Sequence, residues 1–288
     1  MKNLCIFSLV FAFLFAGCEN STDVVNNKMD WTAPTHPFMA PNGKSNIHND
    51  AYMTDAYSIK GPDSEMLNIT MSNLNQLCVS IAFNRENKLV TLGVGADSKR
   101  NLYILEPTTL EVIDNYQLPT GTDLTPSGAG YFYLDQNYRV VVPTVDKRIF
   151  KLSCEGNPAK FILENEYDLS SLPDPCHIIS ALPDWSGNLW FATEEGIVGI
   201  VSSNKLETFQ LSHFDSDIEV KESIANSFAV DETGGVFIVT DYALYRLDTD
   251  NNGKPIISWR EEYDRGSVKK PSQFSQGSGT TPTLISKD

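Results

Sequence analysis

The sequence predicts an all-β fold, built from four-stranded sheets that repeat along the chain. Short β-rich runs come in groups of four, and a similar polar turn separates the first two runs of every group. These turns begin at Asn84, Asp135, Asp184 and Asp231, which gives repeat lengths of 51, 49 and 47 residues. Four short strands at such a spacing are typical of the blades of a β-propeller, in which neighbouring sheets cover each other's faces.

The expected strands fall into four groups in chain order. Those of the first two groups are 79–83, 88–94, 101–105, 111–116, then 131–134, 138–142, 148–152 and 160–163. Those of the last two groups are 178–182, 189–193, 197–201, 206–211, then 227–230, 236–240, 243–247 and 256–259. Asp and Asn suit the turns because their side chains bond the nearby backbone, and glycine supplies a positive φ. A β-sandwich with similar strands is the alternative architecture.

The pattern continues at the C-terminal end. Residues 279–288 read as the first strand of a fifth blade. Because closed propellers have about four to eight blades, either residues 66–71 complete the last blade or the chain is a truncated gene product. We favour truncation, which would leave an open arc with exposed strand edges.

The N-terminal residues have the layout of a secretory signal. Lys2 gives a positive start, and residues 4–15 are almost entirely apolar, yet this run is too short to span a membrane. The sequence L-F-A-G-C at residues 14–18 resembles a bacterial lipoprotein signal. This resemblance implies that Cys18 is lipidated and that the protein is secreted and anchored to a membrane of the bacterial cell envelope, with inner and outer membrane both open. An ordinary signal peptide followed by a chance cysteine is the alternative.

These features divide the chain into four parts. Residues 1–17 are the expected lipoprotein signal peptide, and residues 18–30 comprise the lipidated cysteine and a flexible tether. Residues 31–76, rich in Pro, Asn, His and Tyr, form an expected extended capping loop. Residues 77–288 carry the β-propeller blades.

Charge and cysteine spacing exclude some classes of partner. The formal net charge is −15 and no basic cluster offsets it, which excludes nucleic acid as the main partner. Beyond Cys18, the cysteines Cys78, Cys154 and Cys176 have no zinc-site spacing, and we expect them to be small buried residues. A disulfide between Cys154 and Cys176 is the alternative.

Two segments resemble known propeller groups. The sequence P-D-W-S-G-N-L-W-F-A-T at residues 183–193 is similar to a strand pair of virginiamycin B lyase-like, gluconolactonase-like and two-component-sensor propellers. Residues 245–259 resemble a blade of quinoprotein dehydrogenases. Both motifs are structural, so the resemblance implies the propeller fold and says little about chemistry.

In propellers, ligands bind where the loops before the innermost strands meet, and this expectation comes from analogy with the fold. Here these loops are 127–130, 174–177, 225–226 and 277–280. They include His177, a candidate for catalysis or ligation because imidazole titrates near neutral pH. A hydrogen bond from His177 to a backbone carbonyl is the structural alternative.

The expected capping loop contains a second candidate pair, His48 and Asp50. On a strand, both side chains would point to one face. The loop could then act as a lid over the channel or supply ligands. The alternative is a capping segment whose polar groups satisfy one another.

A third candidate is a partial calcium loop. Asp248, Asp250 and Asn252, followed by a glycine, copy the first half of the D-x-[DN]-x-[DN]-G pattern, whose oxygens suit a calcium ion. The second half fails, because Ile256 and Trp259 occupy the ninth and twelfth positions. A tight hairpin rich in Asp and Asn has the same sequence without an ion.

Together these features favour a lipid-anchored envelope protein that binds a protein, a glycan or a small molecule. The alternative is a propeller enzyme, either a metal-dependent lactonase-like hydrolase or a lyase. Resemblance to the lactonases implies Glu, Asn and Asp ligands, and the relevant loops offer Asp174 and Asn226 but no evident Glu. A quinoprotein dehydrogenase is a more distant alternative.

Overall fold

The computed structural model describes residues 31–57, 59–61, 67–97, 99–120, 130–269, 271 and 276–285. The chain divides into two units, Met1–Thr32 and Ala33–Asp288. Of the first unit only Trp31 and Thr32 are described, so the expected signal peptide, Cys18 and the tether as far as residue 30 lie outside the described residues. No helix within the described ranges is long and apolar enough to cross a membrane.

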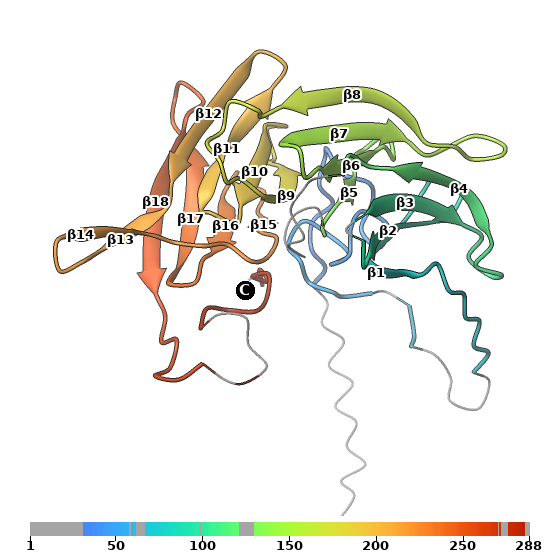
Figure 1. Ribbon diagram of the computed structural model, residues 1–288, viewed down its shortest axis with the longest axis horizontal. Helices are drawn as coiled ribbons and strands as arrows, with labels where there is room; N and C mark the ends of the chain where they lie inside the picture. The colour runs from blue at the N-terminus through green and yellow to red at the C-terminus, as the bar shows by residue number, and fades with distance from the viewer. Residues whose placement is uncertain are drawn as a thin grey trace, which may run out of the picture. The chain divides into compact units, whose positions relative to one another are not determined.

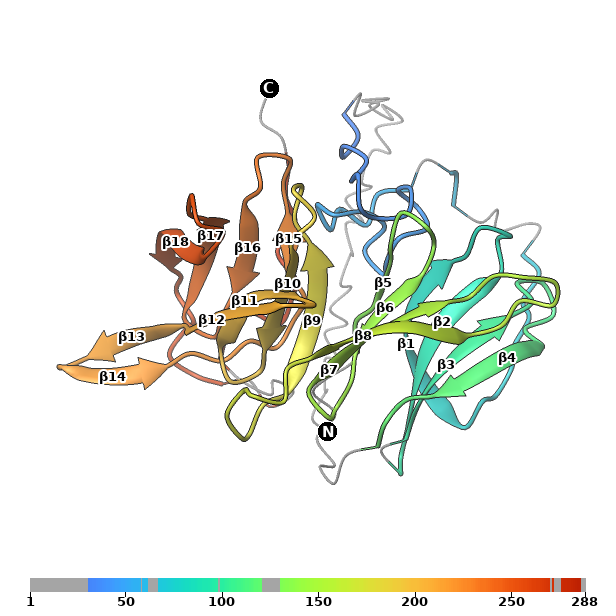
Figure 2. The same cartoon turned by 90° about the horizontal axis from the view of Figure 1, so that it is seen from above.

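The described part of the second unit is all-β, as predicted, and contains no helix. Its strands form four antiparallel four-stranded sheets and one separate hairpin (Figures 1 and 2). The first two sheets are β1 (Gln76–Phe83), β2 (Leu89–Gly95), β3 (Arg100–Leu105), β4 (Val112–Gln117), then β5 (Tyr133–Leu134), β6 (Val140–Pro143), β7 (Arg148–Ser153) and β8 (Ile162–Asp168). The other two are β9 (Ile178–Pro183), β10 (Leu189–Thr193), β11 (Ile197–Ser202), β12 (Lys205–Gln210), then β15 (Ala229–Val230), β16 (Val236–Val239), β17 (Ala243–Thr249) and β18 (Pro255–Glu262). In each sheet neighbouring strands follow one another in the chain.

Each of the expected strands overlaps one strand of these sheets, so the predicted groups of four are confirmed. The sequence did not predict the hairpin of β13 (Ser212–Asp215) and β14 (Ile218–Lys221). Its large apolar side chains, Phe214 and Ile218, are exposed, so the hairpin lacks the buried face that marks a strand in a sequence. In both figures it extends away from the sheets.

The expected first strand of a fifth unit is not a strand in the described residues 279–285. This segment runs along residues of the N-terminal loop instead. The Leu284 N–H donates to the Tyr52 carbonyl at 2.9 Å, and the Thr283 hydroxyl donates to the Met53 carbonyl at 2.8 Å. Residues 67–71, considered as a strand that completes the last blade, have no strand assignment either, and Met66 lies outside the described residues.

The four turns that set the repeat share one geometry. At Asn84, Asp135, Asp184 and Asp231 the backbone N–H donates to the carbonyl four residues later at 2.9–3.0 Å. The side-chain oxygen of each accepts the N–H of that same later residue at 2.7–3.0 Å. The residue three positions on has a positive φ in every case, whether it is Asn87, Tyr138, Gly187 or Gly234. An Asx turn at a fixed position therefore closes the first hairpin of every sheet.

The sheets pack face to face in chain order. Alternate residues of the second sheet belong to different hydrophobic clusters, because neighbouring strand residues point to opposite faces. Val140 and Val142 join the cluster that contains residues of the first sheet, whereas Val141 and Ile149 join the cluster that contains the third and fourth sheets. The second sheet thus lies between the first and the third.

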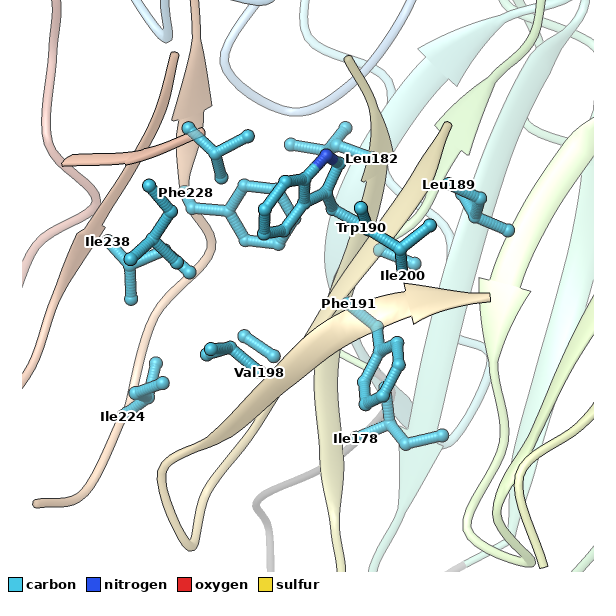
Figure 3. Packing of buried hydrophobic residues seen from close by; sticks show 14 of the residues in the cluster. Ile178, Leu182, Leu189, Trp190, Phe191, Val198, Ile200, Ile224, Phe228 and Ile238 are labelled. Atoms are coloured by element: carbon cyan, nitrogen blue, oxygen red, sulfur yellow. The ribbon is translucent and has the colours of Figure 1, made fainter. Parts of the chain in front are cut away.

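Neighbouring residues of β10 also point to opposite faces, although here both belong to one hydrophobic cluster. Trp190 and Phe191 are fully buried, and Figure 3 shows them on opposite faces of the strand, with the Trp190 indole beside Phe228. The indole N–H donates to the Asp184 carboxylate at 3.0 Å, so the turn also satisfies the one polar group of this large core side chain.

The N-terminal loop is built into this body. Residues 36–53, which we call the central segment, bond the first strands of three sheets. The Phe83 N–H donates to the Lys44 carbonyl at 3.3 Å, the Leu134 N–H to the Ser45 carbonyl at 2.7 Å, and the Val230 N–H to the Ala51 carbonyl at 2.9 Å. In the described part of the expected capping loop, the central segment therefore belongs to the folded body, whereas residues 67–75 are almost all exposed and have no strand assignment.

Candidate functional site

His48 lies where the central segment meets the loop before β5. Its Nδ1 is 3.1 Å from Asp55 Oδ2, and its ring stacks on Tyr131 with 6.3 Å between centroids. The buried Nε2 has no hydrogen-bond partner among the described residues. The ring is thus fixed in orientation, with one nitrogen held by a carboxylate.

Asp50 does not pair with His48. The Asp50 side chain is buried and accepts hydrogen bonds from the Thr54 backbone N–H and hydroxyl. Burial raises the pKa of Asp50, and the Thr54 hydrogen bonds only partly oppose this. The segment is a series of turns and not a strand, so the condition under which both side chains would share one face is not met, and the partner of His48 is Asp55.

The loops before the first strands converge in part as expected. The Tyr131 hydroxyl donates to the Asn226 carboxamide oxygen at 3.4 Å, and the Asn226 carboxamide donates to the Ser278 carbonyl at 3.3 Å. Gly130 accepts a hydrogen bond from the Ser80 hydroxyl at 2.5 Å, whereas residues 127–129 lie outside the described residues. These contacts bring the loops before β5 and β15 together with the C-terminal segment beside His48.

A cavity of about 270 Å³ opens between the central segment and β1. Its lining is mostly apolar and includes Ile47, Tyr57, Ile81 and Phe83, together with the free thiol of Cys78. Its volume is near the lower limit of ordinary ligand pockets, which is about 300 Å³. The cavity suits a ligand the size of one ring.

His177 contacts two carboxylates. Its Nδ1 is 2.6 Å from Glu195 Oε1 and 3.7 Å from Glu194 Oε2, and its backbone N–H donates to Glu195 Oε2 at 3.0 Å. The sequence analysis identified His177 and missed both glutamates. They follow β10 directly, and β10 pairs with the strand that His177 precedes, so a correct strand register could have located them.

The lactonase-like ligand set does not form from the residues named for it. Asp174 is exposed and pairs with Lys147 at 2.5 Å, while Asn226 bonds Tyr131 and Ser278. These two side chains therefore have separate partners.

The residues of the partial calcium loop form a tight hairpin turn between β17 and β18. The Asp250 N–H donates to the Lys254 carbonyl at 2.8 Å, its Oδ1 accepts the Asn252 and Lys254 N–H groups, and Gly253 has a positive φ. This is the Asx turn of the four repeat turns, here between β17 and β18. Asp248 points its carboxylate to Arg246, with Nε at 3.0 Å, and to the Ser258 hydroxyl. The described contacts favour the tight-hairpin alternative.

The expectation of small buried cysteines is confirmed for Cys154 and Cys176, and the alternative of a disulfide between them is wrong. Cys154 and Cys176 are free and buried, and burial raises the pKa of each thiol to about 12. Cys78 is also free but exposed, against the expectation that it is buried.

A buried acidic group also escaped the sequence analysis. Glu222 precedes β15 and is fully buried, and its carboxylate accepts hydrogen bonds from Arg260 Nη2 at 2.7 Å and from the Thr240 hydroxyl. His213 Nδ1 of the β13–β14 hairpin lies 3.2 Å from the same carboxylate. The network connects the hairpin to β18.

Comparison with known proteins gives one informative similarity. The chain is 28% identical over 248 residues to an uncharacterized protein of Archaeoglobus fulgidus, and the match covers 83% of this chain and 46% of the relative. The chain thus spans about half the length of that relative. No protein-family model matches the sequence.

Proposed function

We propose that the protein is a lipid-anchored β-propeller of the bacterial cell envelope that binds a small molecule beside its central segment. The proposal is supported by the position of that segment in the fold. The segment is hydrogen-bonded to the first strands of three sheets, and a cavity of about 270 Å³ lies between it and β1. A site built on rigid strands holds its ligand contacts in place.

The propeller part of the proposal is supported by repetition. The same Asx turn closes the first hairpin of each four-stranded sheet, and the sheets pack face to face in chain order. In the last three sheets the fourth strands β8, β12 and β18 are more exposed than the first strands β5, β9 and β15, which are buried, whereas in the first sheet both β1 and β4 are partly exposed. Burial at the first strand and exposure at the fourth is the radial order of a propeller blade.

Among the three ligand classes, a small molecule fits the cavity best. Its apolar side chains and the ring of Tyr57 suit an apolar or aromatic ring, and its volume leaves little room beyond that. The exposed side chains of Tyr57 and Ile81 border the cavity and leave it accessible.

Filling the cavity tests the proposed binding. A panel of single-ring fragments would be screened by ligand-observed NMR against the full chain in detergent, against Ile81→Trp, and against Leu77→Trp. Leu77 is an exposed residue of the same strand that does not line the cavity, so it is the matched control. We expect binding to the wild type and to Leu77→Trp, and loss of binding to Ile81→Trp. Equal binding to all three chains, or no binding to the wild type, would contradict the proposal.

The lipid anchor has its own test. Cys18→Ser should abolish incorporation of labelled palmitate and move the protein from the membrane fraction to the soluble fraction of the expressing cells. Retention of the label by the variant would show that the anchor is elsewhere.

A further inference from the structure

Three metal-ligating side chains converge at one end of the third sheet. His177 comes just before β9, and Glu194 and Glu195 form the turn between β10 and β11. One ligand atom from each of the three residues lies within 4.8 Å of the other two. Neighbouring residues of a strand point to opposite faces, so only the turn allows both glutamates to face the same imidazole.

The backbone holds this arrangement in place. The Glu194 N–H donates to the His177 carbonyl at 2.9 Å, and the Gln210 carboxamide donates to the Glu195 carbonyl at 2.7 Å. The turn also packs closely on the chain before β15. A Cβ at Gly196, which has a φ of +75°, would lie 2.0 Å from the Glu222 carbonyl oxygen. Such supporting contacts orient ligands before a metal binds.

The charge of the cluster favours a cation. Neither Glu194 nor Glu195 forms an ion pair with Lys or Arg among the described residues, so one imidazole faces two carboxylates. The side chains of His177, Glu194 and Glu195 are 15%, 41% and 21% exposed, which leaves the cluster reachable from solvent. Two neighbouring carboxylates that are partly buried are stabilised more by a bound cation than two fully solvated ones, because the effective dielectric constant around them is lower.

The donor set selects the type of cation. One imidazole nitrogen and two carboxylate oxygens suit zinc and related divalent transition metals, whereas calcium takes about six to eight oxygen ligands. Tetrahedral zinc with ligand bonds of about 2.0–2.2 Å places neighbouring ligand atoms about 3.3 Å apart. The Nδ1–Oε contacts of 2.6 Å and 3.7 Å bracket that separation, so each needs to change by less than about 1 Å.

We propose that His177, Glu194 and Glu195 bind one divalent transition-metal ion of the zinc class through His177 Nδ1 and one oxygen of each carboxylate. The ion takes the place of the proton between His177 and Glu195, and its fourth position is left for water or a ligand. This site is separate from the cavity beside β1 and does not depend on ligand binding there.

The test is a zinc titration of the full chain in detergent after metal removal, with a chromophoric chelator as competitor. The variants are Glu194→Gln and His177→Gln. Glu194→Gln is the safer variant for folding, because its carboxylate makes no hydrogen bond to the backbone of the turn among the described contacts. The matched control is His48→Gln, because His48 is similarly buried and has the Asp55 carboxylate at 3.1 Å, but among the described residues it belongs to no group of three possible metal ligands.

We expect one zinc ion per chain for the wild type and for His48→Gln, and at least a tenfold weaker affinity for both site variants. Zinc should also raise the melting temperature of the wild type and leave that of Glu194→Gln nearly unchanged, because only a ligand that binds the folded state stabilises it. Absence of stoichiometric zinc in the wild type, or equal affinity in the wild type and both site variants, would overturn the proposal. Loss of zinc in His48→Gln alone would place the site elsewhere and also overturn it.

Discussion

At the scale of single residues, one turn chemistry recurs in settings of very different burial. Asp184 is buried and accepts the backbone N–H groups of Ser186 and Asn188 as well as the Trp190 indole N–H. Asp250 makes the same turn near the surface and accepts the backbone N–H groups of Asn252 and Lys254. We therefore expect Asp184 to contribute more than Asp250 to the free energy of unfolding, although both residues make the same turn.

Asp184→Ala tests this difference. The variant leaves buried donors without an acceptor, so we expect the free energy of unfolding to fall by about 3 kcal/mol. Asp250→Ala, the control, exposes its donors to water and should have a much smaller effect. Urea denaturation of both variants measures the difference, and equal losses would contradict this account of the turns.

His36 gives a pH dependence. Its ring is buried with its centroid 4.0 Å from that of Trp185, and burial lowers its pKa to about 4, although the nearby Asp184 charge partly opposes the shift. The imidazole is neutral in the folded chain and takes up a proton on unfolding below about pH 6.5. Stability is therefore lost as the pH falls from about 6.5 to 4.

His36→Phe removes this titration and keeps a ring beside Trp185. We expect the stability advantage of the wild type over the variant to be constant above about pH 6.5 and to shrink by about 3 kcal/mol down to pH 4. Urea denaturation of both chains at several pH values measures it. A difference that does not change with pH would show that His36 titrates alike in the folded and unfolded states.

At the scale of elements, the fourth sheet and the β13–β14 hairpin meet at buried Glu222. Its carboxylate joins Arg260 of β18, Thr240 after β16 and His213 of the hairpin. Removing a buried acceptor leaves the donors that faced it without a hydrogen-bond partner.

Glu222→Ala should lower the free energy of unfolding by about 2–3 kcal/mol, because the Thr240 hydroxyl and one Arg260 N–H group lose their buried acceptor while Glu262 still pairs with the guanidinium. Glu262→Ala is the matched control, since Glu262 bonds the same guanidinium at 2.7 Å but is exposed, and it should have little effect. Thermal or urea unfolding compares the two variants. A loss for Glu262→Ala as large as that for Glu222→Ala would refute the role assigned to burial.

The elements also show what a sequence can predict. The sheet strands were predictable because they bury apolar residues between turns marked by Asp, Asn and Gly. The cluster at His177 was predictable only in part, because its glutamates depend on the register that places Thr193 opposite Ile178 across an irregularity between β9 and β10. Glu222 was not predictable, because a lone acidic residue in a sequence does not indicate burial.

At the scale of the whole molecule, the central segment connects parts of the fold that are distant in sequence. It bonds β1, β5, β15 and the C-terminal segment, and it carries His48 and one wall of the cavity. The proposed function depends on this segment being part of the folded body. Residues 67–75 provide a contrast within the same chain, because they are almost all exposed and without strand assignment.

Hydrogen–deuterium exchange of the full chain, read by mass spectrometry, tests this claim most directly. We predict that peptides covering residues 38–53 exchange far more slowly than peptides of residues 67–75. The Ala40 N–H is bonded to the Leu134 carbonyl of β5, and the N–H groups of Gly43, Lys44, Asn49 and Met53 are bonded to carbonyls within the segment. Peptides covering residues 67–75 should exchange within seconds. If residues 38–53 exchanged as fast as 67–75, the segment would not belong to the folded body, and the proposed ligand site would have no support.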